Sequence, residues 1–247
     1  MILKNKQNLR KELASKPIAE KLWMLESLSE RTLALRPESS VTVPNEPWPV
    51  PNNWKWRKMG DVATIIGGST PRTDRPEYFG GDIPWITPSD LSKHTTKTIS
   101  HGARNISAEG LQNSGASLLP VGTILFSTRA PIGYVAITAT QVATNQGFKS
   151  FVMKNEVISD YVYYYLQHAR KLAVQMANGT TFLELSGKKA AQIPIPVAPL
   201  PEQRRIVAEI EKQFSLLEEG VAALQQTTPL RQAVLQKAFT GELVRCG

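Results

Sequence analysis

The stretch IPIPVAPLPEQRRIVAEI, residues 193–210, separates two kinds of structure in this chain of 247 residues. Its first half alternates proline with apolar residues, and proline lacks the backbone N–H that a helix interior or a central β-strand needs. Its second half contains no proline after residue 201 and begins a helical pattern of apolar residues. We therefore expect a strand-rich domain to end near residue 200 and a long helix to follow it.

The segment before this boundary, residues 54–200, consists of short apolar runs separated by Gly, Pro and Asn, which is typical of β-strands joined by turns. One helix is expected over SDYVYYYLQHARKLAVQMA, residues 159–177, with Ser159 as its N-cap. Its tyrosines are expected to belong to the core, and the predicted fold class is α+β, with many strands and long loops. The expected strands are VATII (62–66), IPWIT (83–87), GTILFST (122–128), GYVAITAT (133–140) and FKSFVM (148–153).

The segment ahead of residue 54 falls into two parts. Residues 1–36 are expected to be helical, because Pro17 suits a first helical turn and Ile18, Leu22 and Leu25 recur at helical spacing. Residues 37–53 carry five prolines, which predicts an extended, semi-rigid linker and a domain boundary.

The segment after the boundary, residues 201–247, carries a narrow apolar seam. Its spacing, alternately three and four residues, is that of the a and d positions of a coiled coil. A helix over residues 201–226 would be about 39 Å long, and one small domain could not cover its exposed seam. The alternative is an amphipathic helix packed on its own domain, although such a helix has a wider apolar face. The seam residues are Val207, Ile210, Phe214, Leu217, Val221 and Leu224.

Charge and cysteine content limit the possible partners. The net charge is +8, and residues 54–200 contribute most of the excess, with 15 Lys and Arg against 9 Asp and Glu. This local excess favours a polyanionic partner, whereas a basic but merely solvated surface is the simpler alternative. No apolar run is long enough for a membrane span and the N-terminus does not resemble a signal peptide, so no membrane partner is expected. The single cysteine, Cys246, fits a cytoplasmic protein without an internal disulfide.

Sequence signatures of catalysis are missing. The chain has no Walker loop, no HExxH, no GxSxG and no adenine-methylation motif of the Asn-Pro-Pro-Tyr type. The carboxylates of residues 74–82 lie among prolines and glycines, which offer no rigid scaffold for a metal. We therefore expect a binding protein with no catalytic residue, no metal site and no bound cofactor. Metal-ligand spacing is also absent among the histidines His94, His101 and His168.

Six segments spanning residues 54–244 carry a resemblance to a known family, and the part from IPIP to LPEQRRIV, with the later AFTGEL, is the most specific. In order they are WKWRKMGDVATIIGGSTP, DIPWITPSDL, LPVGTILFSTRAPIGYVAI, TNQGF, NGTTFLELSGKKAAQIPIPVAPLPEQRRIVAEIE and LRQAVLQKAFTGELV. The chain resembles the specificity subunits of type I restriction-modification systems. More narrowly, it resembles one target-recognition domain, residues 54–200, followed by one spacer helix, residues 201–247.

The resemblance implies that the chain reads double-stranded DNA on behalf of a complex of several subunits. A separate modification subunit would methylate adenine with S-adenosylmethionine, and a separate restriction subunit would use ATP and Mg²⁺ to translocate and cleave DNA. Family members usually hold two recognition domains apart on two antiparallel helices and read a bipartite site. The rival hypothesis is a truncated assembly or regulatory module that binds modification subunits without reading DNA.

With one recognition domain and one spacer helix, the chain is expected to be a natural half-subunit or a fragment. Met1 and the ending ELVRCG favour a natural short chain. Two copies would then pair through the seam as a homodimer and restore two recognition domains. In the competing arrangement, the N-terminal helix folds back onto the seam and the protein is a monomer.

Four loops are expected to contact DNA, because they combine Arg or Lys with hydroxyl groups and tight turns. In the first, GGSTPRTDRPEYF (67–79), Gly67 and Gly68 would let the backbone approach a phosphate, unless this is only a solvated loop. The others are SKHTTKTISHGARN (92–105), STRAPIGY (127–134) and NGTTFLELSGKK (178–189); in STRAPIGY, a buried structural ion pair is the alternative for its arginine. The candidate contacts are Ser69, Thr70, Arg72, Arg75, Lys93, His94, Lys97, Arg104, Arg129, Thr180, Thr181 and Lys188.

Overall fold

The computed structural model describes residues 46–129, 131–179 and 183–216, and these residues adopt a mixed α+β fold, as the sequence predicts. The chain divides into two compact units, residues 1–200 and 201–247. The predicted N-terminal helix over residues 1–36 lies outside the described residues. So do Thr180, Thr181, Leu217, Val221 and Leu224.

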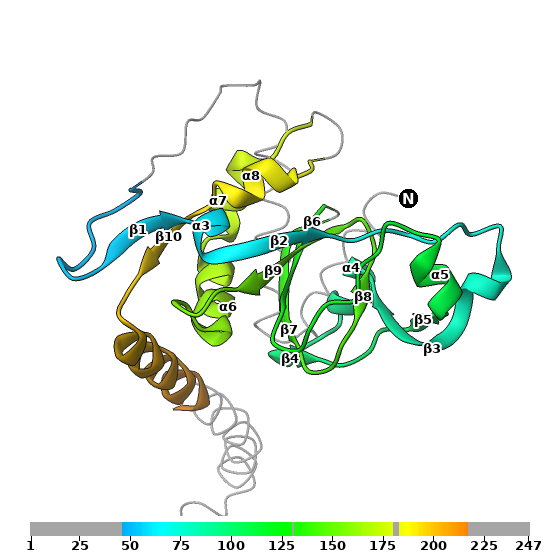
Figure 1. Cartoon of the computed structure of the whole chain (residues 1–247). Helices are drawn as coiled ribbons and strands as arrows, with labels where there is room; N and C mark the ends of the chain where they lie inside the picture. The colour runs from blue at the N-terminus through cyan, green and yellow to red at the C-terminus, as the bar shows by residue number, and fades with distance from the viewer. Residues whose placement is uncertain (1–45, 130, 180–182, 217–247) are drawn as a thin grey trace, which may run out of the picture. The chain divides into compact units, whose positions relative to one another are not determined.

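A five-stranded sheet forms the centre of the first unit (Figure 1). Neighbouring strands run antiparallel, except for the last pair, which is parallel. The middle strand is buried along its whole length, which accounts for its apolar sequence. In spatial order the strands are β2 (Ala63–Gly67), β9 (Phe148–Met153), β6 (Ile124–Thr128), β7 (Ile132–Thr138) and β4 (Thr98–Ile99).

Both faces of this sheet are covered. Helices α6 (Ser159–His168) and α7 (Arg170–Met176) pack on β7. Leu125 and Phe148 belong to a buried cluster that also contains Ile99 of β4 and, from outside this sheet, Ile86 and Leu91. Because side chains alternate across a strand, the neighbours of Leu125 in β6 point to the opposite face. A core on each side of the sheet therefore holds the loops at its ends in fixed positions.

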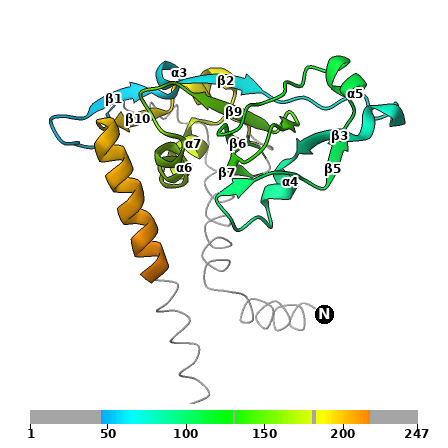
Figure 2. The same cartoon turned by 60° about the horizontal axis from the view of Figure 1, so that its bottom comes forward.

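A three-stranded sheet lies at one end of the unit, and β1 and β10 lie at the other (Figures 1 and 2). In its middle is β3 (Phe79–Ile86), paired antiparallel with β5 (Arg104–Ile106) and parallel with β8 (Ala143–Thr144). Three short elements connect its strands, namely η1 (Pro76–Tyr78), α4 (Pro88–Leu91) and α5 (Ala108–Gln112).

The predicted strands are confirmed with shifts of at most a few residues. The largest difference is at the start of the second expected strand, since β3 begins at Phe79 rather than at Ile83. Val62 was expected in a strand but ends the short helix α3 (Met59–Val62), where it is buried.

The alternating prolines lie in a two-stranded sheet, formed by β1 (Lys55–Lys58) and β10 (Pro194–Val197). The hydroxyl of Tyr161 donates a hydrogen bond to the carbonyl of Pro196 at 2.7 Å, and that of Tyr165 donates to the carbonyl of Pro194. These carbonyls therefore point away from β1, and the missing proline N–H groups remove no hydrogen bond from the strand pair. The absence of a central strand here and the core position of Tyr161 and Tyr165 are confirmed.

The helical prediction over residues 159–177 is wrong in two details. Two helices, α6 and α7, replace one, and the break falls at Ala169, where the backbone leaves the helical conformation with φ −78° and ψ 4°. Ser159 is not the N-cap, which is Ile158. The hydroxyl of Ser159 instead donates to the carbonyl of Gly122 at 2.7 Å, so the side chain ties α6 to the start of β6. After α7, another short helix, α8 (Gly187–Ala191), precedes β10.

A helix described over residues 200–216 supplies the described part of the second unit. Its polar residues pair along their own surface, as in the bond of 2.7 Å from the side chain of Gln213 to that of Glu209. The expected exposure of the seam is wrong for Val207, which is only 8% exposed. Phe214 remains 48% exposed. Exposure therefore differs along the described part of the seam.

Candidate nucleic-acid interface

A cleft of about 400 Å³ opens where the three-stranded sheet meets the ends of β2 and β6. Segments from five parts of the sequence line it, and none of its lining side chains is a carboxylate. The lining residues are Thr70, Trp85, Thr87, Pro88, Ser89, Arg104, Arg129, Asn145 and Gly147. We call this set the cleft.

Arg104, at the start of β5, has its guanidinium over two aromatic rings. Its guanidinium carbon is 5.1 Å from the ring centre of Trp85 and 5.8 Å from that of Phe79. Trp85 is itself fixed, because it is 2% exposed and its indole N–H donates to the carbonyl of Ser69 at 3.1 Å. No ion pair joins Arg104 to a carboxylate within the described residues. Stacking therefore holds this cation in place while leaving its charge uncompensated.

Arg129 follows β6 and reaches the same cleft. Its Nη1 lies 3.9 Å from Oε2 of Glu184, at the outer limit of an ion pair, and its side chain is 36% exposed. The sequence left open whether this arginine is a buried structural ion-pair partner. The ion pair exists, but it is solvated, and exposed pairs of this kind contribute little to stability. Arg129 therefore remains available to a second anion.

Asn145, in the turn between β8 and β9, presents donors to the cleft. Its Oδ1 accepts a hydrogen bond from the backbone N–H of Gly147 at 2.9 Å, which assigns the amide orientation and leaves the Nδ2 group for another acceptor. Across the cleft, the hydroxyl of Thr87 donates to Asp90 at 2.7 Å and lies 2.8 Å from that of Ser89. The hydroxyl of Thr70 likewise donates to the side chain of Gln146. The cleft thus combines two cations with the amide donors of Asn145, a combination that suits an acceptor-rich or anionic ligand.

Gly68 has a role that the sequence did not suggest. A Cβ atom at this position would come within 2.0 Å of the carbonyl oxygen of Asn145. The next residue, Ser69, donates its backbone N–H to the carbonyl of Thr144 at 2.9 Å. The glycine therefore permits a close approach of the chain to itself, which is a structural reason for this residue beside the expected approach to a DNA phosphate. This approach positions Thr70 at the cleft.

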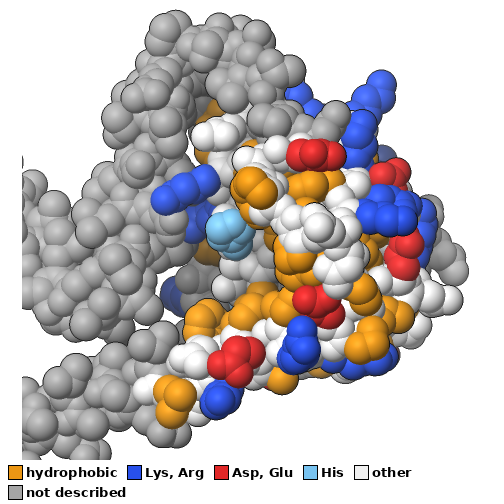
Figure 3. All heavy atoms as spheres, turned by 90° about the vertical axis from the view of Figure 1, so that its left-hand side faces the viewer, with side chains coloured by type: hydrophobic (Ala, Val, Ile, Leu, Met, Phe, Trp, Pro, Cys, Tyr) orange, Lys and Arg blue, Asp and Glu red, His pale blue; other side chains and the backbone are white. Residues whose placement is uncertain are grey.

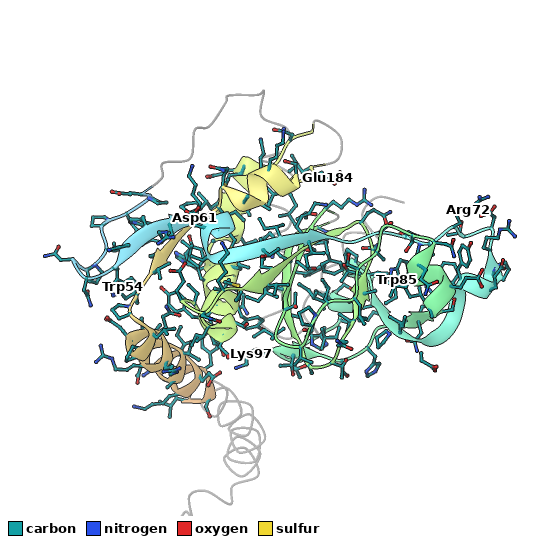
Figure 4. The ribbon with its side chains drawn as sticks, viewed as in Figure 1. Trp54, Asp61, Arg72, Trp85, Lys97 and Glu184 are labelled. Atoms are coloured by element: carbon teal, nitrogen blue, oxygen red, sulfur yellow. The ribbon has the colours of Figure 1, made fainter. Side chains whose placement is uncertain are left out.

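The two arginines of the loop over residues 67–79 do not line the cleft. Arg72 forms two bonds with Asp74, of 3.1 Å and 2.7 Å, and both side chains are more than 60% exposed. This bonding lowers the pKa of the Asp74 carboxyl. Arg75 lies 3.5 Å from Glu77. Figure 4 shows Arg72 at the far end of the unit, directed away from it, whereas Trp85 lies within the fold.

The loop over residues 92–105 does not act as one surface. The Lys97 ammonium lies 2.6 Å from the Asp160 carboxylate and 5.9 Å from the ring centre of Tyr164, so this lysine faces α6. A ring nitrogen of His94 lies 2.9 Å from the carbonyl oxygen of Thr98, within its own loop. Of the four candidates here, only Arg104 lines the cleft.

Lys93 and Lys188 are exposed, and neither lines the cleft. Lys188 lies on α8, next to Lys189, whose ammonium donates to the side chain of Asn178. These lysines can add to the basic charge of the unit, but the structure does not group them with Arg104 and Arg129.

Sequence reasoning found Thr70, Arg104 and Arg129 but missed the other six cleft residues, of which four have polar or aromatic side chains. The segments WITPS and TNQGF contain them, and the second segment was quoted only as a family motif. The available signal was a run of hydroxyl and amide residues directly after an apolar strand. These four are Trp85, Thr87, Ser89 and Asn145.

The face at the β1 and β10 end of the first unit differs from the cleft. Figure 3 shows cations and carboxylates mixed among apolar side chains there, without a large patch of one sign. In the part of the chain that the structure describes, no group of His, Cys, Asp and Glu could hold a metal ion. Nor does any described helix have the length and apolar character needed to cross a bilayer.

The fold is shared with solved structures of type I restriction-modification systems. A chain from a structure concerned with complex assembly and conformational transition of the type I R-M system aligns over 98% of this chain and 58% of its own length, with a TM-score of 0.60 and 23% identity. The HsdS subunit from Thermoanaerobacter tengcongensis aligns over 98% of this chain and 56% of its own, with a TM-score of 0.56 and 23% identity.

The sequence defines the family more closely. The model of the type I restriction modification DNA specificity domain matches residues 51–223, and the chain belongs to this family. The specificity subunit of the type I restriction enzyme MjaIX from Methanocaldococcus jannaschii is 40% identical over 173 residues, which cover 69% of this chain and 40% of that protein. The HindI specificity subunit of Haemophilus influenzae is 27% identical over 202 residues, 78% of this chain and 42% of that protein. The chain thus spans about two fifths of the length of these relatives.

Proposed function

We propose that this chain is the sequence-specific DNA-recognition component of a type I restriction-modification complex. The observation that supports this most directly is the cleft, where an uncompensated Arg104 and a solvated Arg129 stand among neutral donors without a lining carboxylate. Such groups suit the phosphate oxygens and base edges of duplex DNA. Membership in the specificity-domain family is the second support.

The chemistry of the complex is assigned to other subunits. In this proposal, a modification subunit binds S-adenosylmethionine and methylates adenine, and a restriction subunit uses ATP and Mg²⁺. This chain catalyses no step and works in the cytoplasm beside its DNA. Its contribution is binding free energy that brings the modification subunit to a chosen site.

We further propose that two copies pair through the C-terminal helix as antiparallel spacers. The seam spacing supports a helix partner. Two identical recognition domains on a two-fold axis would read an interrupted palindrome, whose gap is set by helix length. If the chain is a natural half-subunit, two copies pair in this way. If it is a fragment, it forms one half of a longer protein.

Salt dependence tests the proposed DNA binding. The full chain in complex with its modification subunit is expected to bind selected duplexes, with an affinity that falls linearly with salt on logarithmic axes, because phosphate contacts release counterions. Fluorescence anisotropy at several salt concentrations measures the slope. An affinity that ignores salt, or one that is equal for every sequence, would count against this function.

The alternative function is an assembly module that binds modification subunits without reading DNA. The same experiment separates the two proposals, since such a module would form the protein complex normally. Adding this chain to the modification subunit would then leave the sequence preference of DNA binding unchanged. The local basic excess of residues 54–200 favours the DNA-reading function.

A further inference from the structure

We propose that the cleft grips the DNA backbone and that Arg104 is a phosphate contact, while sequence is read by the projecting loop that carries Arg72. This inference rests on the proposed DNA-binding function. It divides the DNA-contacting residues into those that hold phosphates and those that read bases. It depends on the shape of the surface and on the pairing state of the two arginines.

Shape is the first argument. Base edges lie at the floor of the major groove, which is about 8.5 Å deep, so a side chain that reads them has to project from the protein. Phosphates line the outside of the duplex and can enter a recess. The cleft is such a recess, and the guanidinium of Arg104 is held over the Trp85 ring at 5.1 Å, at the wall of this recess. Arg72 lies at the tip of an exposed loop (Figure 4).

Chemistry is the second argument. Phosphate contacts in protein–DNA complexes come from Arg together with Ser, Thr and Asn side chains, and the cleft holds all four residue types. Asn145 lines the cleft, and because its Oδ1 accepts from Gly147, its Nδ2 group is the part of the amide left for a ligand. No carboxylate lines the cleft to repel an anion. Arg72, in contrast, is bonded to Asp74 through two hydrogen bonds, a closer pairing than the 3.9 Å between Arg129 and Glu184, so a phosphate would have to compete with a carboxylate for Arg72.

The test uses the full chain in complex with its modification subunit and a duplex library with a randomised centre. For Arg104→Ala, we expect the selected consensus to stay unchanged and affinity to fall about tenfold or more on every sequence. The salt slope should become shallower by about 0.9, the value of one phosphate contact. Arg104→Lys keeps the charge and should retain the slope.

A second cleft variant and a control complete the design. Asn145→Asp keeps the oxygen that Gly147 uses but replaces the donors with a negative charge, so affinity should fall on all sequences with the consensus retained. Arg57→Ala is the matched control, because Arg57 lies in β1 at the other end of the unit and near Asp61 and Glu156. It should leave the slope unchanged, and thermal unfolding checks that every variant folds.

The possible failures point to different conclusions. If the wild-type complex selects no sequence, the proposed function itself is wrong. If it selects one and Arg104→Ala loses preference at a defined position, Arg104 reads a base and the inference is overturned. An unchanged slope in Arg104→Ala, or an equal loss in Arg57→Ala, would also overturn it.

Discussion

Arginines with the same expected role have different surroundings in this protein. Arg104 is held by the faces of Trp85 and Phe79 and keeps its charge open to solvent. Arg72 is held by a neighbouring carboxylate and is charge-neutral as a pair. The difference arises from neighbours and not from residue type. Because of this difference, Arg104 can neutralise a phosphate without first breaking an ion pair, whereas Arg72 cannot.

Gly133, in β7, is a residue at which folding depends on the absence of a side chain. Its φ is +102°, and a Cβ atom would come within 2.4 Å of Cγ of Arg170. Arg170 cannot easily withdraw, because it is 7% exposed and its Nε donates to the carbonyl of Ile132 at 3.1 Å. Gly133→Ala should therefore combine backbone strain with a collision.

We expect Gly133→Ala to lower the free energy of unfolding by more than the strain alone, which is about 1–3 kcal/mol. Gly122→Ala is the matched control, since its φ is +81° but its Cβ would have no closer neighbour than Ser159 Oγ at 3.9 Å. Urea unfolding of both variants measures the difference. Equal losses would show that Arg170 moves aside without cost.

At the scale of elements, two tyrosine hydroxyls join helix α6 to strand β10. Tyr161 and Tyr165 stand one helical turn apart, and Pro194 and Pro196 stand two residues apart, so each hydroxyl meets one carbonyl. The prolines free those carbonyls from the strand pair, and the helix uses them. Burial of this contact raises the pKa of Tyr165 above its ordinary value of 10.0.

This raised pKa predicts a loss of stability in alkali. The unfolded tyrosine ionises near pH 10, whereas the folded one stays protonated, so the unfolded state binds fewer protons above that pH. The contribution is complete below about pH 10 and is lost as the pH rises toward the folded value. Urea midpoints measured at neutral and alkaline pH should show this fall.

Tyr165→Phe is the control for the alkaline effect. It should lower stability at neutral pH by about 1–3 kcal/mol, because a buried carbonyl loses its donor. The further fall in alkali should then be smaller than in the wild type. It should not vanish, because burial also raises the pKa of Tyr163. An identical alkaline fall in both proteins would contradict the assignment to Tyr165.

At the scale of the whole molecule, the seam predicts a dimer. Covering a large apolar side chain stabilises by about 1.5–3 kcal/mol, and a two-fold axis lets one patch cover itself. Phe214→Glu with Leu217→Glu should give a monomer by light scattering, whereas Ala208→Glu adds a glutamate off the seam and should stay dimeric. A wild-type protein that is monomeric at micromolar concentration would favour the arrangement in which the N-terminal helix covers the seam.

The sequence by itself determined the α+β class, the position of the five longest described strands and the family. It did so because strands alternate with turn residues at short range and because IPIPVAPLPEQRRIV is a long, specific motif. It also located the basic excess in residues 54–200. These features depend on local preferences and composition, which do not require knowledge of contacts between distant residues.

Only the tertiary structure decided which candidates come together. Thr70, Arg104, Arg129 and Asn145 lie far apart along the chain and meet because two sheets end at one place. Lys97, only seven residues before Arg104, faces α6 instead, since β4 pairs with β7 at the edge of a different sheet. The sequence suggested a DNA phosphate near Gly68, because sequence alone does not reveal that the Asn145 carbonyl lies beside this glycine. Sheet packing sets these distances, and no local pattern in the chain encodes them.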